Sequence, residues 1–271
     1  MLVERLLVTA VILPVVALVI VAGDWVFAVS VAAVLSVAAW EFWRMVRSGG
    51  FQPNPLLLIG GVGMLAILRY QFGFVGSQFG ASMLILLTMA ACTRGYELSR
   101  NQSASDFAMT IAGIFYLGWL GGYLVSLRNL PGGEFWTLTV LPAAWLADAG
   151  AYFIGRAFGR HQLSPRVSPK KTWEGYLGGI PVAIIGCALL ATAWQLQVPA
   201  ITPLKGAIIG LVVSILAPMG DLGESMLKRQ FGVKDSSNLL PGHGGFMDRI
   251  DSTLWAGVIG YYLIVFFKFG G

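Results

Sequence analysis

The sequence is poor in charge. Of its 271 residues only 11% are charged, whereas 56% are hydrophobic and the mean hydropathy is +0.75. A soluble domain carries about 25% charged residues, so this chain could not cover the surface of one. Histidine and cysteine are also scarce, with two of each, which excludes a disulfide scaffold or a Cys/His zinc cluster. Cys92 and Cys187 lie in apolar stretches, as buried, reduced thiols do. The composition is that of an integral membrane protein.

Long apolar runs fill the sequence, each close to the length of about 20 residues that a membrane helix needs. The first run is expected to be an uncleaved anchor rather than a signal peptide, joined to the second by a very tight connection around Gly23–Asp24. We predict an all-α, polytopic transmembrane protein with about nine spans: Leu6–Ala22, Trp25–Trp40, Pro55–Arg69, Phe79–Thr93, Phe107–Leu127, Phe135–Gly155, Tyr176–Leu196, Leu204–Gly223 and Ser252–Phe267.

The basic residues alternate with these spans. With nine spans, 14 of the 18 Lys and Arg residues fall on the side that holds the N-terminus. Because Lys and Arg accumulate in cytoplasmic loops, we expect a cytoplasmic N-terminus, a location in the inner membrane of a bacterium and an active site that faces the cytoplasm. Nine of the 14 lie in only two loops, however. An alternative is that these two loops are basic because they bind a substrate.

Polar chemistry is concentrated in the second half of the chain. Seven of the 13 acidic residues and both histidines lie between positions 148 and 251. We interpret residues 1–130 as N-terminal transmembrane scaffold helices and residues 131–271 as a C-terminal transmembrane catalytic region, both within one integrated membrane domain. The few early charges, such as Asp24, Glu41 and Arg69, stand near span ends beside Trp or Tyr, which is typical of interfacial anchors.

Two aspartates adjoin long apolar runs. An ionised carboxylate there costs about 2.5–3.5 kcal/mol unless it faces protein, water or a cation, so Asp148 and Asp221 each need a partner. A buried ion pair with an Arg, or a protonated carboxyl, would also meet that need. Asp221 shares one helix face with other polar side chains. Glu224, Ser225 and Lys228 follow it at positions i+3, i+4 and i+7.

A glycine-rich loop precedes the last span. Residues 241–245 surround His243 with Pro and Gly, so the loop can adopt positive φ and bring backbone N–H groups close to an anion. His243 could equally be a loop-stabilising donor. The first turn of the next helix offers Asp248, Asp251 and Ser252, whose hard oxygen ligands suit Mg²⁺.

A basic loop covers residues 155–175. It holds five basic residues together with Ser164, Ser168 and Thr172, ahead of a helix start. One interpretation is a loop that touches anionic lipid headgroups; the other is a phosphate cradle of hydroxyl and ammonium donors beside a helix N-terminus. Phosphate donors, magnesium carboxylates and a bilayer location together indicate phosphoryl or nucleotidyl transfer on a lipid headgroup.

The run from Ser225 to Asp251 resembles the signature of the phosphatidate cytidylyltransferases, also called CDP-diacylglycerol synthases. Residues 168–175 and the series Asp148, Tyr152, Gly155 also resemble motifs of this family, whereas the N-terminal half is similar only in being hydrophobic. The resemblance implies condensation of CTP with phosphatidic acid to CDP-diacylglycerol and pyrophosphate, with Mg²⁺ required.

The resemblance also implies roles for individual residues. Asp221 and Asp248 would be the metal carboxylates for Mg²⁺, with K⁺ as a second cation, and Lys228, Ser225 and His243 would complete the catalytic set. The implied partners are CTP, phosphatidic acid in the bilayer, membrane lipids and a second copy in a homodimer, with no nucleic acid. The implied substrate-binding residues are Ser168, Lys170, Lys171, Thr172, Arg229, Lys234, Arg249 and Asp148.

Two rival functions remain open from the sequence. A CTP-dependent kinase of the polyprenol or phytol type would attack the γ-phosphorus and release CDP instead of pyrophosphate. A cation-coupled membrane transporter would also place aspartates within the membrane. The transporter, however, favours polar groups at the bilayer midplane, whereas these groups gather towards one interface.

Overall fold

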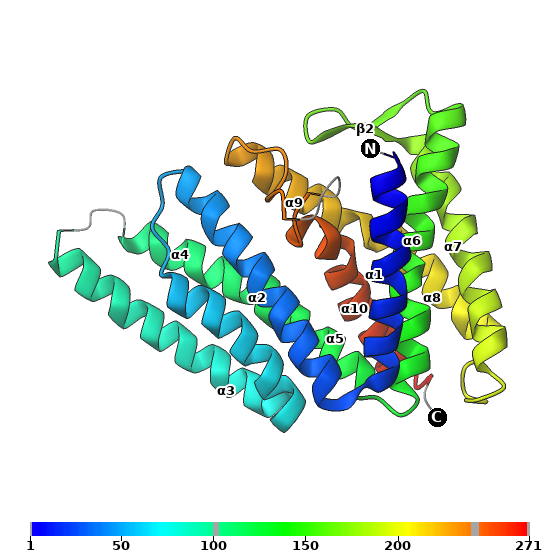
Figure 1. The fold of residues 1–271 in the computed structure, drawn as a ribbon, viewed down its shortest axis with the longest axis horizontal. Coiled ribbons are helices and arrows are strands. Elements are labelled where there is room, and N and C mark those ends of the chain that lie inside the picture. Colours follow the sequence, from blue (N-terminus) through cyan, green and yellow to red (C-terminus); the bar gives the residue numbers. More distant parts are fainter. Residues whose placement is uncertain (1, 100–102, 240–243, 270–271) are drawn as a thin grey trace. The chain divides into compact units, whose positions relative to one another are not determined.

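The computed structural model describes residues 2–99, 103–239 and 244–269, with side chains from residue 12 onward. Of these described residues, 80% are helical. The helices are drawn as coiled ribbons in Figure 1. Its elements are, in order, α1 (Leu2–Ala22), α2 (Asp24–Ser48), η1 (Leu56–Gly60), α3 (Gly61–Glu97), α4 (Ser103–Gly113), η2 (Ile114–Trp119), α5 (Leu120–Arg128), α6 (Gly133–Phe158), β1 (Gln162–Ser164), β2 (Ser168–Thr172), α7 (Trp173–Trp194), α8 (Pro203–Leu216), α9 (Pro218–Gln230) and α10 (Met247–Phe266).

The chain divides into two compact units. Unit 1 comprises residues 1–126 and 228–250, and unit 2 comprises residues 127–227 and 251–271. The first boundary lies close to the predicted division after residue 130, but residues 228–250 group with the N-terminal unit. The division into scaffold and catalytic region is a statement about function and stays a prediction.

Within the described residues, six helical stretches are long and apolar enough to cross a membrane. The chain is therefore a helical membrane protein, as its composition predicts. α1 and α10 are not among these six stretches. In α1 the apolar part for which side chains are described, Ile12–Ala22, is shorter than a span. The count of nine spans and the cytoplasmic N-terminus stay predictions. One departure from the all-α expectation is a two-stranded antiparallel hairpin, β1 with β2, where a loop was expected.

The long stretch Leu56–Glu97 is two helical segments rather than one. A straight helix of its 42 residues would be about 63 Å long, twice the hydrocarbon thickness of about 30 Å. The backbone leaves helical geometry at Gly73, where φ is 62° and ψ is −145°. A Cβ on Gly61 would lie 2.8 Å from Leu84, and one on Gly80 would lie 2.6 Å from Leu68. The two segments therefore pack antiparallel, at the positions of the third and fourth predicted spans (Figure 1).

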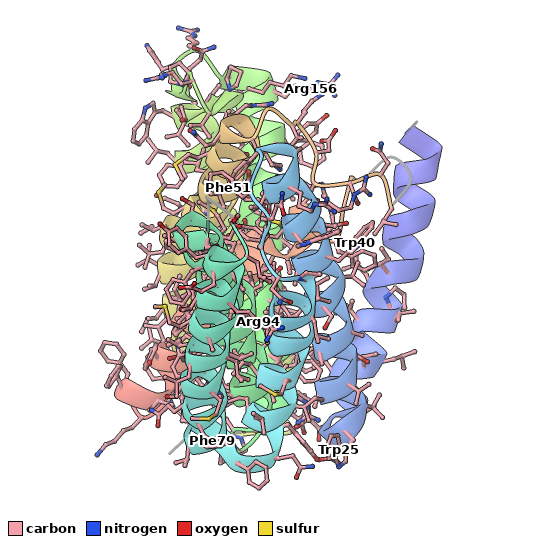
Figure 2. All side chains as sticks on the ribbon, turned by 90° about the vertical axis from the view of Figure 1, so that its left-hand side faces the viewer. Trp25, Trp40, Phe51, Phe79, Arg94 and Arg156 are labelled. Carbon is pink, nitrogen blue, oxygen red and sulfur yellow. The ribbon has the colours of Figure 1, made fainter. Side chains whose placement is uncertain are left out.

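Aromatic contacts mark the same end of unit 1 as this turn. The ring centroids of Trp25 and Tyr70 lie 4.7 Å apart, so the start of α2 adjoins the end of the first segment of α3. In Figure 2, Trp25 and Phe79 lie at one end of unit 1, and Phe51 lies away from them. The predicted tight connection is also present, because α2 begins two residues after α1 ends and Gly23 has a φ of 63°.

Unit 2 is held together by close helix contacts at small residues. A Cβ on Gly150 of α6 would lie 3.0 Å from the Cα of Gly179 in α7, and one on Gly210 of α8 would lie 2.5 Å from the carbonyl oxygen of Ala183 in α7. Small residues let membrane helices approach closely enough for backbone contact. The α6–α7–α8 layer therefore depends on glycines that a longer side chain would force apart.

Two early charges are not interfacial anchors, and that interpretation is wrong for them. Glu41 is fully buried, and Arg69 is 2% exposed. The Arg69 guanidinium lies 3.9 Å from the centroid of the Phe74 ring and donates to the hydroxyls of Ser77 and Ser126 at 2.7 and 3.0 Å. A cation desolvated over an aromatic face is stabilised by the ring quadrupole. Position beside an aromatic residue did not distinguish these buried charges from anchors.

Substitution of Gly73 tests the turn within α3. An alanine there must adopt backbone angles that essentially only glycine visits, so we expect Gly73→Ala to lower the free energy of unfolding by about 1–3 kcal/mol. Gly60→Ala is the matched control, because Gly60 is helical and a Cβ there meets nothing within 4 Å. Thermal unfolding in detergent, followed by circular dichroism, compares the two. Equal stability would contradict the turn.

Candidate active site

The Asp248 carboxylate is surrounded by donors from unit 1. Lys228 Nζ donates to Oδ1 at 2.5 Å. On the other oxygen, Oδ2 accepts from the Ser236 hydroxyl at 2.8 Å, from the Ser236 backbone N–H at 3.0 Å and from the Gly245 N–H at 2.8 Å. The Asp248 side chain is only 6% exposed. One ammonium and three neutral donors thus compensate the burial of this charge.

The glycines that precede Asp248 make room for this arrangement. Gly244 has a φ of +79°, and a Cβ there would lie 2.7 Å from Asp248 Oδ2. A Cβ on Gly245 would lie 2.5 and 2.6 Å from the two carboxylate oxygens of Glu41. The predicted positive φ and close approach to an anion are both present. The anion that the Gly245 amide contacts is the protein's own Asp248.

Asp221 lies in unit 2 with a second lysine. Lys171, at the end of β2, donates from Nζ to Asp221 Oδ2 at 2.6 Å, and the two side chains are 27% and 30% exposed. The Ser225 hydroxyl donates to Asp221 Oδ1 at 3.2 Å. This contact confirms the predicted i, i+4 relation on α9. Asp221 is thus paired but, unlike Asp248, still accessible.

Two other aspartates of unit 2, Asp221 and Asp148, act on Asp251. Burial raises the pKa of Asp251 to about 7, and the negative charges of Asp221 and Asp148 add to the rise. α9 can approach Asp251 because position 220 is glycine, where a Cβ would lie 2.6 Å from the Asp251 carbonyl oxygen. A cation held near these carboxylates would offset the repulsion that raises the pKa of Asp251.

The donor chemistry near Asp221 suits Mg²⁺. In the described part of the chain, no three His, Cys, Asp or Glu side chains are arranged as a ready metal cage. Mg²⁺ does not need one, because it typically binds one or two carboxylates and takes waters and substrate phosphate oxygens as its other ligands. Asp221, partly exposed and acidic in its surroundings, fits such an open site. Asp248, with both oxygens engaged, fits only if Lys228 moves away.

The predicted phosphate cradle is the β-hairpin and the start of α7. Thr172 caps α7, since its hydroxyl accepts from the Gly175 N–H at 3.2 Å. Glu174 closes the base of the hairpin by accepting from the Arg160 N–H at 3.0 Å and contacting His161 Nδ1 at 2.5 Å. An open hollow of about 780 Å³ lies beside this base, lined by Arg160, His161, Gln162, Pro165 and Trp173.

The other predicted residues differ in their exposure. Ser168 is half-buried in β2, and Asp148 is exposed on α6. His243 lies outside the described residues. Four of the basic residues predicted to bind substrate have exposed side chains: Lys170 in unit 2, and Arg229, Lys234 and Arg249 in unit 1.

Sequence reasoning missed Glu41 and Ser236. The Ser236 hydroxyl lies 2.9 Å from a Glu41 oxygen and 2.8 Å from an Asp248 oxygen. The sequence did contain a signal, because Glu41 adjoins the apolar run that forms α2. An ionised carboxylate is costly in such a run unless it has a partner, as argued for Asp148 and Asp221.

Comparison with known proteins gives a consistent result. A family model described as the cytidylyltransferase family matches residues 3–267. The phosphatidate cytidylyltransferase of Synechocystis sp. is 32% identical over 90% of this chain and 89% of its own length. The phosphatidate cytidylyltransferase of Bacillus subtilis is 34% identical over 92% of this chain and 92% of its own length. That of Pseudomonas aeruginosa is 37% identical over 83% of this chain and 83% of its own length.

The two Asp–Lys pairs should differ in their contribution to stability. Removing one partner of a buried pair costs about 3–5 kcal/mol, whereas a partly exposed pair contributes about 1 kcal/mol or less. We therefore expect Lys228→Met to lower the free energy of unfolding by about 3 kcal/mol and Lys171→Met by much less. Denaturation of both variants in the same detergent measures the difference. A larger loss for Lys171→Met would contradict the assigned burial.

Proposed function

The chain belongs to the cytidylyltransferase family, and from this membership we propose how its residues carry out the family's chemistry. It is an enzyme that makes CDP-diacylglycerol from CTP and phosphatidate. What we propose beyond this is the use of Mg²⁺, the residues that form the site, the side of the membrane that it faces and the oligomeric state.

One observation carries the proposal for the site. Each aspartate proposed as a metal carboxylate is paired with a lysine proposed as a phosphate ligand: Asp221 with Lys171, and Asp248 with Lys228. Anionic phosphates attract the ammonium groups and cations attract the carboxylates, so each pair offers one group for a phosphate and one for a metal ion. Each lysine has three N–H donors and can turn towards a phosphate from the position that it holds beside its aspartate.

We propose that Asp221 and Asp248 hold Mg²⁺, with K⁺ as a second cation. When bound, Mg²⁺ would neutralise the negative charge that develops on the phosphate oxygens during the reaction. Support comes from the oxygen-rich, acidic surroundings of Asp221 and from the raised pKa of Asp251 beside it.

The protein's own part in the reaction is to position two anions. A phosphate oxygen of phosphatidate attacks the α-phosphorus of CTP, the bond between that phosphorus and the oxygen bridging to the β-phosphorus breaks, and pyrophosphate leaves with the bonding electrons. The attacking oxygen is already anionic near neutral pH, so no strong general base is needed. Ser225 and His243 would orient substrate or cation, and the phosphates would be held by Lys170, Lys171, Lys228, Arg229, Lys234 and Arg249, with Ser168, Thr172 and Asp148 completing the substrate site.

The released product tests the reaction. Purified protein with CTP, phosphatidic acid and Mg²⁺ should release pyrophosphate, and EDTA should stop the release. Release of CDP instead would indicate a lipid kinase. Cation uptake by proteoliposomes without either product would indicate a transporter.

Substitution of the two aspartates tests the metal site. We expect Asp221→Asn and Asp248→Asn each to lower turnover by about 100-fold or more, because several kcal/mol of charge stabilisation are lost. Arg44→Ala is the control, since Arg44 is exposed and its guanidinium lies over the Trp40 ring in unit 1. Near-normal turnover of either asparagine variant would remove that residue from the site.

We further propose that the site faces the cytoplasm, in the inner membrane of a bacterium, and that the protein is a homodimer. CTP does not cross a bilayer, so inverted membrane vesicles should use added CTP and right-side-out vesicles should not. The mass of the detergent-solubilised protein, corrected for bound detergent, should equal two chains. The opposite vesicle result, or a mass of one chain, would contradict the respective proposal.

A further inference from the structure

Glu41 makes a set of contacts that the reaction chemistry does not explain. It is fully buried on α2. Its Oε2 accepts from the Met247 N–H at 2.7 Å and the Ser236 hydroxyl at 2.9 Å. Its Oε1 accepts from the Phe246 N–H at 3.0 Å and the Ser237 hydroxyl at 2.5 Å. One carboxylate thus holds both ends of the 236–247 segment.

Among the described residues, these contacts compensate the burial of a charge with neutral donors. A buried carboxylate without hydrogen bonds costs several kcal/mol; here Oε1 accepts a backbone N–H and the Ser237 hydroxyl, while Oε2 accepts a backbone N–H and shares the Ser236 hydroxyl with Asp248. The two N–H groups belong to the beginning of α10, where the first amides of a helix have no partner within the helix. Glu41 therefore caps α10, a favourable place for negative charge, from a helix about 200 residues earlier in the chain.

Ser236 links Glu41 to Asp248. Its hydroxyl lies 2.9 Å from Glu41 Oε2 and 2.8 Å from Asp248 Oδ2. A hydroxyl carries one proton, so it can donate to only one of the two carboxylates at a time. The donor that Asp248 receives from Ser236 consequently depends on Glu41. Gly245 completes the link, because a side chain there would collide with both Glu41 oxygens.

We propose that Glu41 is a positioning residue of the active site. It fixes Ser236 and Ser237 on one side and Phe246 and Met247 on the other and, through Ser236 and the start of α10, sets the orientation of the Asp248 carboxylate. This inference rests on the proposed role of Asp248 in the reaction. Glu41 itself contacts donors of its own chain and needs no contact with substrate.

The test replaces Glu41 with glutamine. Glutamine keeps the size of the side chain but turns one acceptor oxygen into an NH₂ donor, so a backbone N–H and a hydroxyl at that end lose their acceptor. We expect kcat to fall by about 10- to 100-fold through misplacement of Asp248, with the KM for CTP changed less than threefold. Glu97→Gln, an exposed glutamate of the same unit, should change neither.

Hydrogen exchange supplies a readout that does not depend on activity. In Glu41→Gln, the amides of Phe246 and Met247 should exchange at least tenfold faster, while those of α6–α8 keep their wild-type rates. Faster exchange with unchanged kcat would overturn the positioning role, and so would a lower kcat with unchanged exchange. If wild-type protein releases no pyrophosphate, the proposed function fails, and the exchange data still report on the Glu41 contacts.

A second variant covers the case in which Glu41→Gln does not fold. Ser236→Ala cuts the link between the two carboxylates but leaves Glu41 its other three donors. We expect Ser236→Ala to lower kcat as much as Glu41→Gln does, with little change in KM. The double variant that carries both substitutions should lose no more kcat than the more affected single variant, because the effects of interacting residues do not add. Full activity of Ser236→Ala, or multiplying losses in the double variant, would contradict the proposal.

Discussion

The arrangement of unit 1 around residues 236–237 and 244–248 depends on the burial of two carboxylates. Glu41 and Asp248 are both removed from water, and a buried negative charge is tolerated only where donors surround it. Those donors come from Lys228, two serines and the amides at the start of α10. Apolar packing contributes as well, because Met247 is buried in the core. The hydrogen bonds fix the described residues on both sides, Ser236 and Ser237 and then Gly245 to Met247.

The same charges connect stability with the proposed chemistry. In each unit an aspartate is neutralised by a lysine, and both members of each pair are the kinds of group that a metal and a nucleotide phosphate would bind. Interactions that stabilise the ligand-free protein therefore compete with ligand binding, a usual source of conflict between stability and activity. The more buried pair, in unit 1, should give way less readily than the partly exposed pair of Lys171 and Asp221.

Much of the fold could be predicted from the sequence, because the lengths of apolar runs and the positions of charged residues are visible along the chain itself. Helical segments occur at the predicted third and fourth spans, and the tight turn at Gly23 is present. The Asp221–Ser225 contact follows from helical periodicity alone. The β-hairpin was missed because its strands are short and polar. Glu41 was missed because its partners lie far away in the chain, and no local pattern indicates which distant amides a buried carboxylate will meet. Assignment of the metal ligands and of His243 stays a prediction.

The separation between Glu41 and its donors bears on how the protein is made. Residue 41 leaves the ribosome 195 to 206 residues before the groups that neutralise it, which at about 5–20 residues per second is a delay of roughly 10–40 s. During that interval the Glu41 carboxylate lacks the donors that it contacts in the folded protein. A chain that ends before residue 236 lacks all four of these donors, so the burial of Glu41 seen in the folded protein requires nearly the whole sequence.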